Sequence, residues 1–349
     1  MPADPFSFRL NPVFLAPATA TATAAALAGA LLLAAPAARA QTQPAVVYDA
    51  GGKFDKSFNE AAYNGMERFR KETGGSYLEF EIANDTQREQ AFRRMAQKGA
   101  NPIIGIGFTQ ASALEKVAKE FPQLKFAIVD MVVNLPNVQS VVFKEQEGSF
   151  LAGMAAAMAS RSGKVGFIGG MDVPLIRRFQ CGYEQGAKYA NPKAETLSNM
   201  TGTTPAAWSD PTRGGELARN QFSRGVDVIF AAAGGTGVGV YQAAKDQGRL
   251  AIGVDSNQNH LHPGTMLTSM MKRVDVAVFS ISKAVKDGSW KPGVQVLGLK
   301  ENGVALAMDE HNAKLVTPEM KKKLDAAQAD IVAGRIKVAD YMADNACRY

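Results

Sequence analysis

The sequence contains few of the residues that most often carry metal and nucleophilic chemistry. Among its 349 residues are three histidines and two cysteines. It has no Walker A motif, no G-x-S-x-G nucleophile elbow and no H-E-x-x-H zinc motif. His260 and His262 lie close together, but no acidic or thiol partner stands at metal-ligand spacing, which favours a loop pair over a zinc site. We therefore expect no metal site, no cofactor and no enzyme.

The chain also lacks a long run of one charge. Its formal net charge is +6 at pH 7, and acidic and basic residues are scattered along its length. The longest basic run is the lysine triplet at residues 321–323, which is typical of the solvated face of a helix. Nucleic acid is therefore not expected as a partner.

The first 40 residues have the layout of a secretory signal peptide. Arg9 comes early, an Ala/Leu-rich apolar stretch covers residues 14–35, and Ala38 and Ala40 stand where a signal peptidase selects small residues. The alternative is a membrane anchor, since a spanning helix needs about 20 apolar residues. The mild hydropathy and the good cleavage site favour cleavage near Ala40. No cysteine lies at this junction, so we expect a periplasmic protein without a lipid or other direct membrane anchor.

The two cysteines, Cys181 and Cys347, are an even number in a chain expected to enter an oxidising compartment. One interpretation is a disulfide that ties the C-terminus to the middle of the chain. The other is a pair of unrelated buried thiols.

Short apolar segments alternate with helical patterns over most of the chain, which predicts an α/β fold with doubly wound parallel sheets. The strand-like segments, each ending near Gly or Asp, are residues 46–52, 102–108, 126–131, 164–170, 226–235 and 251–257. The helical segments are residues 59–73, 86–99, 110–121, 148–160, 212–224 and 239–247.

The two halves of this pattern repeat each other. Gly99 precedes a strand, a Gly-rich turn, a helix and a strand that ends at Asp130, and Gly225 precedes the same series ending at Asp255. We interpret this as a structural duplication in which each half builds one lobe.

The segments that follow the second half predict a hinge between the lobes. A further helix over residues 274–288 and strand-like residues 294–308 return to the first lobe and then to the second, so several chain segments cross between the lobes. The expected division is an N-terminal lobe of residues 44–145 plus 272–293 and a C-terminal lobe of residues 146–271 plus 294–349.

Several candidate binding residues stand where predicted strands end. In open parallel sheets, ligands bind outside the carboxyl ends of the strands, where Asp49, Asp130 and Asp255 are expected, together with the turns at residues 105–107 and 234–239. The second turn lacks the full G-x-G-x-x-G spacing, which disfavours a dinucleotide.

The densest polar cluster lies between Asp49 and Asn59. Its simplest interpretation is that Asp55 or Ser57 caps the next helix while Phe58 packs beneath it. The excess of polar groups around one aromatic side chain favours a ligand instead.

Seven motifs, taken in this order along the chain, resemble the basic membrane protein (BMP) family of ABC-transporter substrate-binding proteins, whose best understood members are purine nucleoside receptors. They are GGKFDKSFN at residues 51–59, FAIVD at 126–130, EGSFLAG at 147–153, GFIGGM at 166–171, VIFAAAGGTG at 228–237, IGVD at 252–255 and TSMMKRVD at 268–275.

The resemblance implies a type I periplasmic binding protein fold, a nucleoside-sized cleft between two lobes, and the permease and ATPase of an ABC importer as partners. It implies that Phe58 and Phe230 stack on the two faces of a purine and that Asn59 and Asp130 hydrogen-bond its edge. It further implies that Asp49 belongs to the pocket and that the ribose is held by Asp255, Lys272 and the backbone of Gly234 and Gly235. General chemistry agrees, because each base offers a face for aromatic stacking and Lys272 favours the ionised form of a neighbouring carboxylate.

The predicted function is therefore a periplasmic receptor for inosine, guanosine or adenosine. Two alternatives stay open: the same architecture with a sugar, a flavin or a modified nucleoside, and a nucleoside-processing enzyme. The enzyme would need carboxylates clustered on one loop to hold a metal ion, and here they are dispersed. Two arginines, Arg177 and Arg178, depart from the family pattern, and their presence in the cleft would indicate a different solute.

Overall fold

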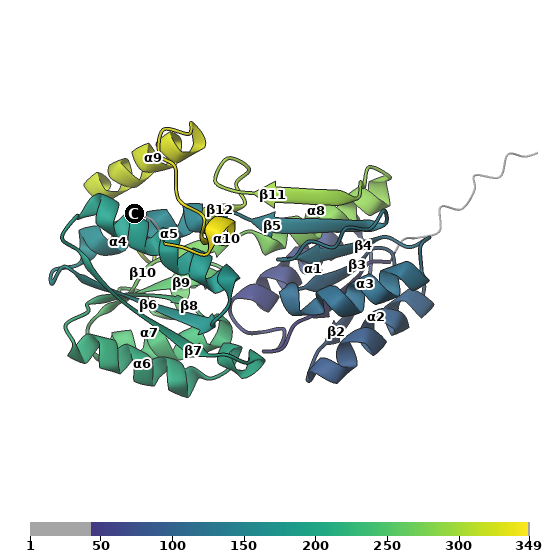
Figure 1. The fold of residues 1–349 in the computed structure, drawn as a ribbon, viewed down its shortest axis with the longest axis horizontal. Helices are drawn as coiled ribbons and strands as arrows, with labels where there is room; N and C mark the ends of the chain where they lie inside the picture. The colour runs from purple at the N-terminus through teal and green to yellow at the C-terminus, as the bar shows by residue number, and fades with distance from the viewer. Residues whose placement is uncertain (1–42, 348–349) are drawn as a thin grey trace, which may run out of the picture. The chain divides into compact units, whose positions relative to one another are not determined.

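The computed structural model describes residues 43–347, and the proposed signal peptide, residues 1–40, lies outside this range (Figure 1). The described residues form two six-stranded sheets, with strand orders β11-β5-β4-β3-β1-β2 and β12-β10-β9-β8-β6-β7. Each sheet and its helices form one lobe. No helix in the described range combines the length and apolar character needed to cross a bilayer.

The first sheet is entirely parallel. Its strands are β1 (Ala45–Tyr48), β2 (Leu78–Glu81), β3 (Ile103–Ile106), β4 (Phe126–Val129), β5 (Val138–Phe143) and β11 (Gly293–Leu297). Its helices are α1 (Phe58–Thr73), α2 (Arg88–Gln97), α3 (Ala111–Glu120) and α8 (Val274–Asp287). All of β1 is buried because alternate side chains face opposite layers: Val46 and Tyr48 pack in the core that holds Met66 of α1, and Ala45 and Val47 in the core that holds Phe92 of α2.

The second sheet is parallel except where β12 pairs antiparallel with β10. Its strands are β6 (Lys164–Met171), β7 (Glu195–Gly202), β8 (Val228–Ala232), β9 (Leu250–Asp255), β10 (Met266–Lys272) and β12 (Val304–Leu306). Its helices are α4 (Glu145–Ala159), α5 (Pro174–Ala190), α6 (Pro211–Ser223), α7 (Gly237–Asp246), α9 (Pro318–Val332) and the short α10 (Tyr341–Asp344). Helices α4 and α5 pack against each other, as do α6 and α7.

The two lobes share backbone conformations at equivalent positions, in agreement with the predicted duplication. Gly99 and Gly225 both take a positive φ, of 75° and 93°, before strands β3 and β8. Asp130 and Asp255, at the ends of β4 and β9, also share a positive φ, of 71° and 63°. For a residue with a side chain this conformation is uncommon, so its occurrence at both positions supports equivalent roles in the two lobes.

Three connections join the lobes within the described residues: one after β5, one after β10 and one after β11. They lie against one another, since the Lys144 N–H donates to the Leu297 carbonyl and the Arg273 N–H to the Gly303 carbonyl. Strand β11 pairs with β5 in the first sheet, whereas the expected division assigned residues 294–349 to the C-terminal lobe. That boundary falls inside β11, and the chain returns to the second sheet only at β12.

The C-terminal segment is joined to α5 by a disulfide between Cys181 and Cys347. Cys181 is fully buried on α5. The lysine triplet at residues 321–323 lies in the first half of α9 and is exposed, as predicted for a solvated helix face.

Candidate functional site

A cavity of about 70 Å³ lies between the lobes, at the carboxyl ends of the strands. The first lobe contributes Asp49, Asp55, Phe58, Asn59, Phe108 and Asp130. The second lobe contributes Ile176, Phe179, Trp208, Gly234, Asp255 and Lys272.

The local structure around Phe58 is set by Asp55. The Asp55 carboxylate accepts hydrogen bonds from the backbone N–H groups of Ser57, Asn59 and Glu60, so it caps the start of α1. Of the two caps predicted, Asp55 therefore acts as the cap, while Ser57 makes no side-chain cap bond. Phe58 is the first residue of α1 and lines the cavity.

Four aromatic side chains line the cavity, two from each lobe. Phe58 and Phe108 come from the first lobe and Phe179 and Trp208 from the second. The Lys272 ammonium lies 5.1 Å from the centroid of the Phe58 ring and 5.6 Å from that of Phe179. A flat, unsaturated ligand therefore meets aromatic side chains on both lobes.

Trp208 was not predicted as a site residue from the sequence. It ends a short 3₁₀ helix, Pro205–Trp208, in the loop that follows the edge strand β7. Its indole ring lies over Gly170 of β6, where a Cβ atom would overlap it, and its carbonyl lies near Gly234. The one available signal was its scarcity, since the chain has only two tryptophans.

Phe230, expected to stack on the ligand, does not line the cavity. It is fully buried in β8, and its ring packs against Phe167, Tyr183 and Phe179, with centroid distances of 5.7, 5.5 and 6.5 Å. The strand alternates its side chains, so Ala232, which lines the cavity, shares a face with Phe230 but stands at the end of the strand. Phe230 is therefore a core residue beneath Phe179, and its expected role as a stacking partner is corrected.

A buried cluster of charges forms the wall at Lys272. Its Nζ lies 2.6 Å from Asp130 Oδ2 and 3.0 Å from Glu145 Oε1. Burial raises the pKa of Asp130 to about 7 against the opposing charge of Lys272, and burial raises the pKa of Asp255 to about 6. Burial alone would lower the pKa of Lys272, but Asp130, Glu145 and Asp255 together raise it above its ordinary value, so the ammonium stays charged. Asp130 Oδ1 is buried without a hydrogen-bond partner and is open to a donor from a ligand.

Asp255 and its neighbours bridge the two lobes. The Ser57 hydroxyl donates to Asp255 Oδ2 at 2.6 Å. The Ser256 hydroxyl donates to the Ser57 carbonyl at 2.7 Å, and the Gln258 amide donates to the Lys56 carbonyl at 2.8 Å. The start of α1 in the first lobe is thus bonded to the end of β9 in the second.

Asp49 and Asn59 line the cavity but use their polar atoms within the protein. Asp49 accepts from Arg88 at 2.7 Å and from the Thr109 hydroxyl at 2.6 Å. The Asn59 amide donates to the carbonyls of Asp49 and Gly52 and accepts from the Asp49 N–H. Both residues hold the loop between β1 and α1 in place, which leaves Asn59 no spare donor for the edge of a base.

The remaining predicted residues divide between the cavity and its surroundings. Gly234 lines the cavity and Gly235 does not; a Cβ atom on Gly235 would lie close to the carbonyls of Trp208 and Asp55. Neither arginine that departs from the family pattern lines the cavity: Arg177 pairs with Asp172, and Arg178 pairs with Glu145 and Asp340. No set of three or more His, Cys, Asp or Glu side chains in residues 43–347 is placed to hold a metal ion.

Comparisons with known proteins agree in family and fold. A family model described as "Bmp: ABC transporter substrate-binding protein PnrA-like" matches residues 42–341. An ABC transporter nucleoside-binding protein, BmpA, from Lactococcus lactis is 34% identical over 319 residues, which cover 84% of this chain and 88% of the relative. An uncharacterised lipoprotein of Pyrococcus abyssi is 37% identical over 275 residues, covering 74% of this chain and 67% of the relative.

A solved structure carries the same fold. The crystal structure of an ABC transporter solute-binding protein from Aeropyrum pernix K1 matches with a TM-score of 0.78 and 29% identity, covering 85% of this chain and 92% of that one. Together with the two α/β lobes and their multiple crossings, this likeness confirms the predicted type I periplasmic binding protein fold.

Proposed function

The chain belongs to the Bmp family of ABC transporter substrate-binding proteins, and from this premise we propose that its solute is a purine nucleoside such as inosine, guanosine or adenosine. The family consists of solute-binding proteins and not of enzymes. In this proposal, the protein delivers the bound nucleoside to the permease and ATPase of an ABC importer.

The observation that carries the proposal is the pairing of aromatic side chains from both lobes with an unpartnered carboxylate oxygen. Phe58 and Phe179 or Trp208 offer faces on which a purine stacks, at about 1–3 kcal/mol for each stacked base. The free Oδ1 of Asp130 accepts a hydrogen bond from an N–H on the edge of the base.

The ribose is assigned to the second lobe. Asp255 and Lys272 line that wall beside the backbone of Gly234, and a carboxylate accepts strongly from hydroxyl groups. A solute held by Asp130 in one lobe and by Asp255 in the other would add to the Ser57–Asp255 bond that already joins them. Ligand binding would therefore favour the closed arrangement of the lobes.

The proposal also covers location. We assign the mature protein to the periplasm, free of the membrane after cleavage near Ala40, because the sequence has no cysteine at that junction. The lipoprotein relative from Pyrococcus abyssi makes an anchored form the competing outcome. N-terminal sequencing of the protein recovered from the soluble and membrane fractions of the producing cells distinguishes them: an intact N-terminus held in the membrane contradicts the assignment.

The identity of the solute is tested by mass spectrometry of the small molecule that copurifies with the protein. A purine nucleoside supports the proposal, whereas a sugar or a flavin refutes it. The variant Phe58→Ala gives the matching test of the site. It should weaken nucleoside binding without changing the melting temperature, because Phe58 is only partly buried at the edge of the core.

A further inference from the structure

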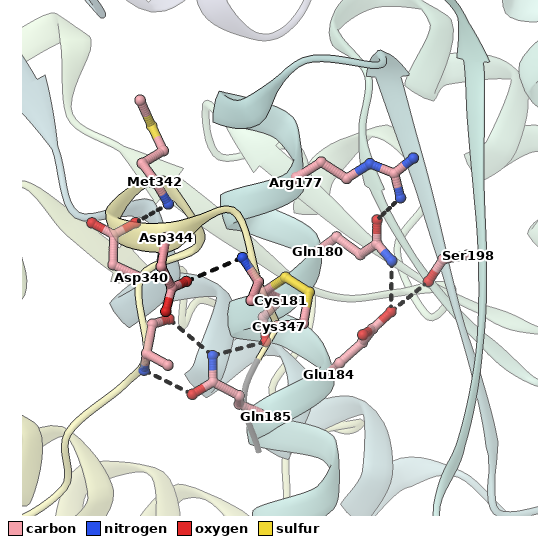
Figure 2. Close-up of a disulfide and its surroundings, with 12 residues drawn as sticks. Arg177, Gln180, Cys181, Glu184, Gln185, Ser198, Asp340, Met342, Asp344 and Cys347 are labelled. Atoms are coloured by element: carbon pink, nitrogen blue, oxygen red, sulfur yellow. Dashed lines mark hydrogen bonds between the residues drawn. A yellow bond between two sulfur atoms is a disulfide. The ribbon is translucent and has the colours of Figure 1, made fainter.

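Residues 339–347 form a strap that lies along α5. Three α5 side chains, Arg178, Cys181 and Gln185, hold it, and their spacing of three and four residues places them on one face of the helix. Cys181 is joined to Cys347 by the disulfide, as Figure 2 shows. The Gln185 side chain donates to the Ala339 carbonyl at 3.0 Å and accepts from the Ala339 N–H at 2.8 Å.

Arg178 connects this strap to the first crossing between the lobes. Its Nε and Nη2 donate to the two oxygens of Asp340, each at 2.8 Å. Its Nη1 donates to the Phe143 carbonyl at 2.8 Å and to Glu145 Oε2 at 2.9 Å. Phe143 ends β5 and Glu145 begins α4, so one guanidinium holds both sides of the connection.

Glu145 extends this contact to the cavity. It is fully buried and does not line the cavity, and while Oε2 faces Arg178, Oε1 lies 3.0 Å from the Lys272 ammonium. Lys272 ends β10 next to the second crossing and is itself a wall of the cavity. A continuous series of ion pairs therefore runs from Asp340 through Arg178, Glu145 and Lys272 to Asp130.

We propose that Arg178 and Glu145 are positioning residues through which the C-terminal strap fixes the Lys272 ammonium at the cavity wall. A lysine is a point charge on a flexible stem. If Asp130 were its only partner, the Lys272 ammonium would be free to turn about that carboxylate. Glu145 supplies a second anchor, and Arg178 fixes Glu145 because its planar fork is already held by Asp340 and by the Phe143 carbonyl.

The experiment compares inosine affinity by calorimetry in the full-length protein and in five variants. Arg178→Met and Glu145→Gln should weaken binding about 5- to 150-fold, the range typical of coupled sites. Arg177→Met is the matched control, because Arg177 lies one residue away on α5 and pairs with Asp172 and Gln180 instead; it should leave the affinity within about twofold. The paired change Cys181→Ala with Cys347→Ala frees the end of the strap and should weaken binding in the same direction as Arg178→Met.

A pH profile separates positioning from a general loss of structure. Asp130 is surrounded by the charges of Lys272 on β10, Glu145 on α4 and Asp255 on β9. Glu145→Gln removes one negative charge and so lowers the pKa of Asp130 and of Asp255. The acid side of the inosine-affinity profile should therefore move to lower pH in this variant and stay in place in Arg177→Met. Arg178→Lys, which keeps the charge, should recover part of the affinity.

The inference is overturned if Arg178→Met binds inosine as tightly as Arg177→Met, or if Glu145→Gln leaves the pH profile unmoved. Wild-type affinity in the cysteine-free variant would overturn the role of the strap. The choice of inosine rests on the proposed function, so a ligand-free measurement stands beside it: amide hydrogen exchange at residues 142–148 and 270–275. This exchange should be faster in Arg178→Met than in Arg177→Met. If the wild type fails to bind inosine while this difference appears, the proposed solute is wrong and the positioning role stands.

Discussion

The substitution Gly170→Ala tests the part of the site that the sequence did not predict. Gly170 lies in β6, outside the cavity, and the Trp208 ring lies directly over it. A Cβ atom on residue 170 would overlap the indole: even Cη2, the third-nearest ring atom, would stand only 2.8 Å away. Carbon atoms pack at about 3.5–4.0 Å, so the ring must move by about 1 Å or more.

The size of the effect follows from the role of Trp208 as a stacking surface. Stacking on an aromatic ring contributes about 1–3 kcal/mol for each base. Displacing the ring should therefore raise the dissociation constant for inosine by about 5- to 150-fold, at 1.4 kcal/mol for each factor of ten. Trp208→Ala should have a similar effect, because it removes the ring that Gly170→Ala displaces.

The assay combines Trp208 fluorescence with a double-mutant cycle measured by calorimetry. The chain contains two tryptophans, so Trp290→Phe leaves Trp208 as its single reporter. Inosine should change the Trp208 emission in this background. Adding Gly170→Ala to Trp208→Ala, followed by calorimetry, should cause little further loss, because both act through one side chain. Additive losses, or an affinity that Gly170→Ala leaves intact, would refute the placement of Trp208 in the binding site.

Three further predictions concern the buried charges and the core. Inosine affinity should fall as the pH drops through about 7 and then 6, because burial raises the pKa values of Asp130 and Asp255 to these values. The hydrogen-bond donors of the ligand need both carboxylates ionised. Calorimetry between about pH 5 and pH 8 measures this dependence, and a flat profile contradicts it. The raised pKa values have the opposite effect on the ligand-free protein, whose buried carboxyls hold more protons than the unfolded chain, so these groups should stabilise it as the pH falls from about 7 towards 4 in thermal melts. Phe230→Ala should lower the free energy of unfolding by about 3–5 kcal/mol, as expected for a core phenylalanine, whereas Phe58→Ala should lower the affinity; urea titrations and calorimetry would show the reverse pattern if Phe230 touched the ligand.

Six of the predicted strands, β1, β3, β4, β6, β8 and β9, are buried on both faces. The exposed edge strand β11 was also predicted, within residues 294–308. Residues 103–106 form a continuous apolar segment because helices cover both faces of a parallel sheet. Strands β2 and β7 were missed, and both stand at sheet edges where polar residues are tolerated: β2 reads LEFE, and most of β7 is only partly buried. Strands β5 and β10 were also missed, although both lie inside their sheets and are largely buried. Helix α5 was missed because its sequence mixes glycine, arginine and aromatic residues, and its burial comes from packing against α4.

The site residues also divide into those that a local sequence pattern predicts and those that it does not. Asp130 and Asp255 were predictable because each follows an apolar strand, and such strand ends meet at one edge of a parallel sheet. Phe230 was misplaced because sequence spacing does not show where along β8 the cavity begins. The positions of Trp208 and Glu145 depend on contacts with residues distant in the sequence, Gly170 and Lys272 respectively. A local sequence pattern does not predict such contacts.

The central claim is that the cavity between the lobes binds a purine nucleoside. The most direct test is calorimetric titration of protein that has been unfolded, stripped of ligand and refolded, with inosine, guanosine and adenosine in turn. We predict saturable one-site binding of at least one of them. Refolded protein that binds none of the three at high micromolar concentration would contradict the claim.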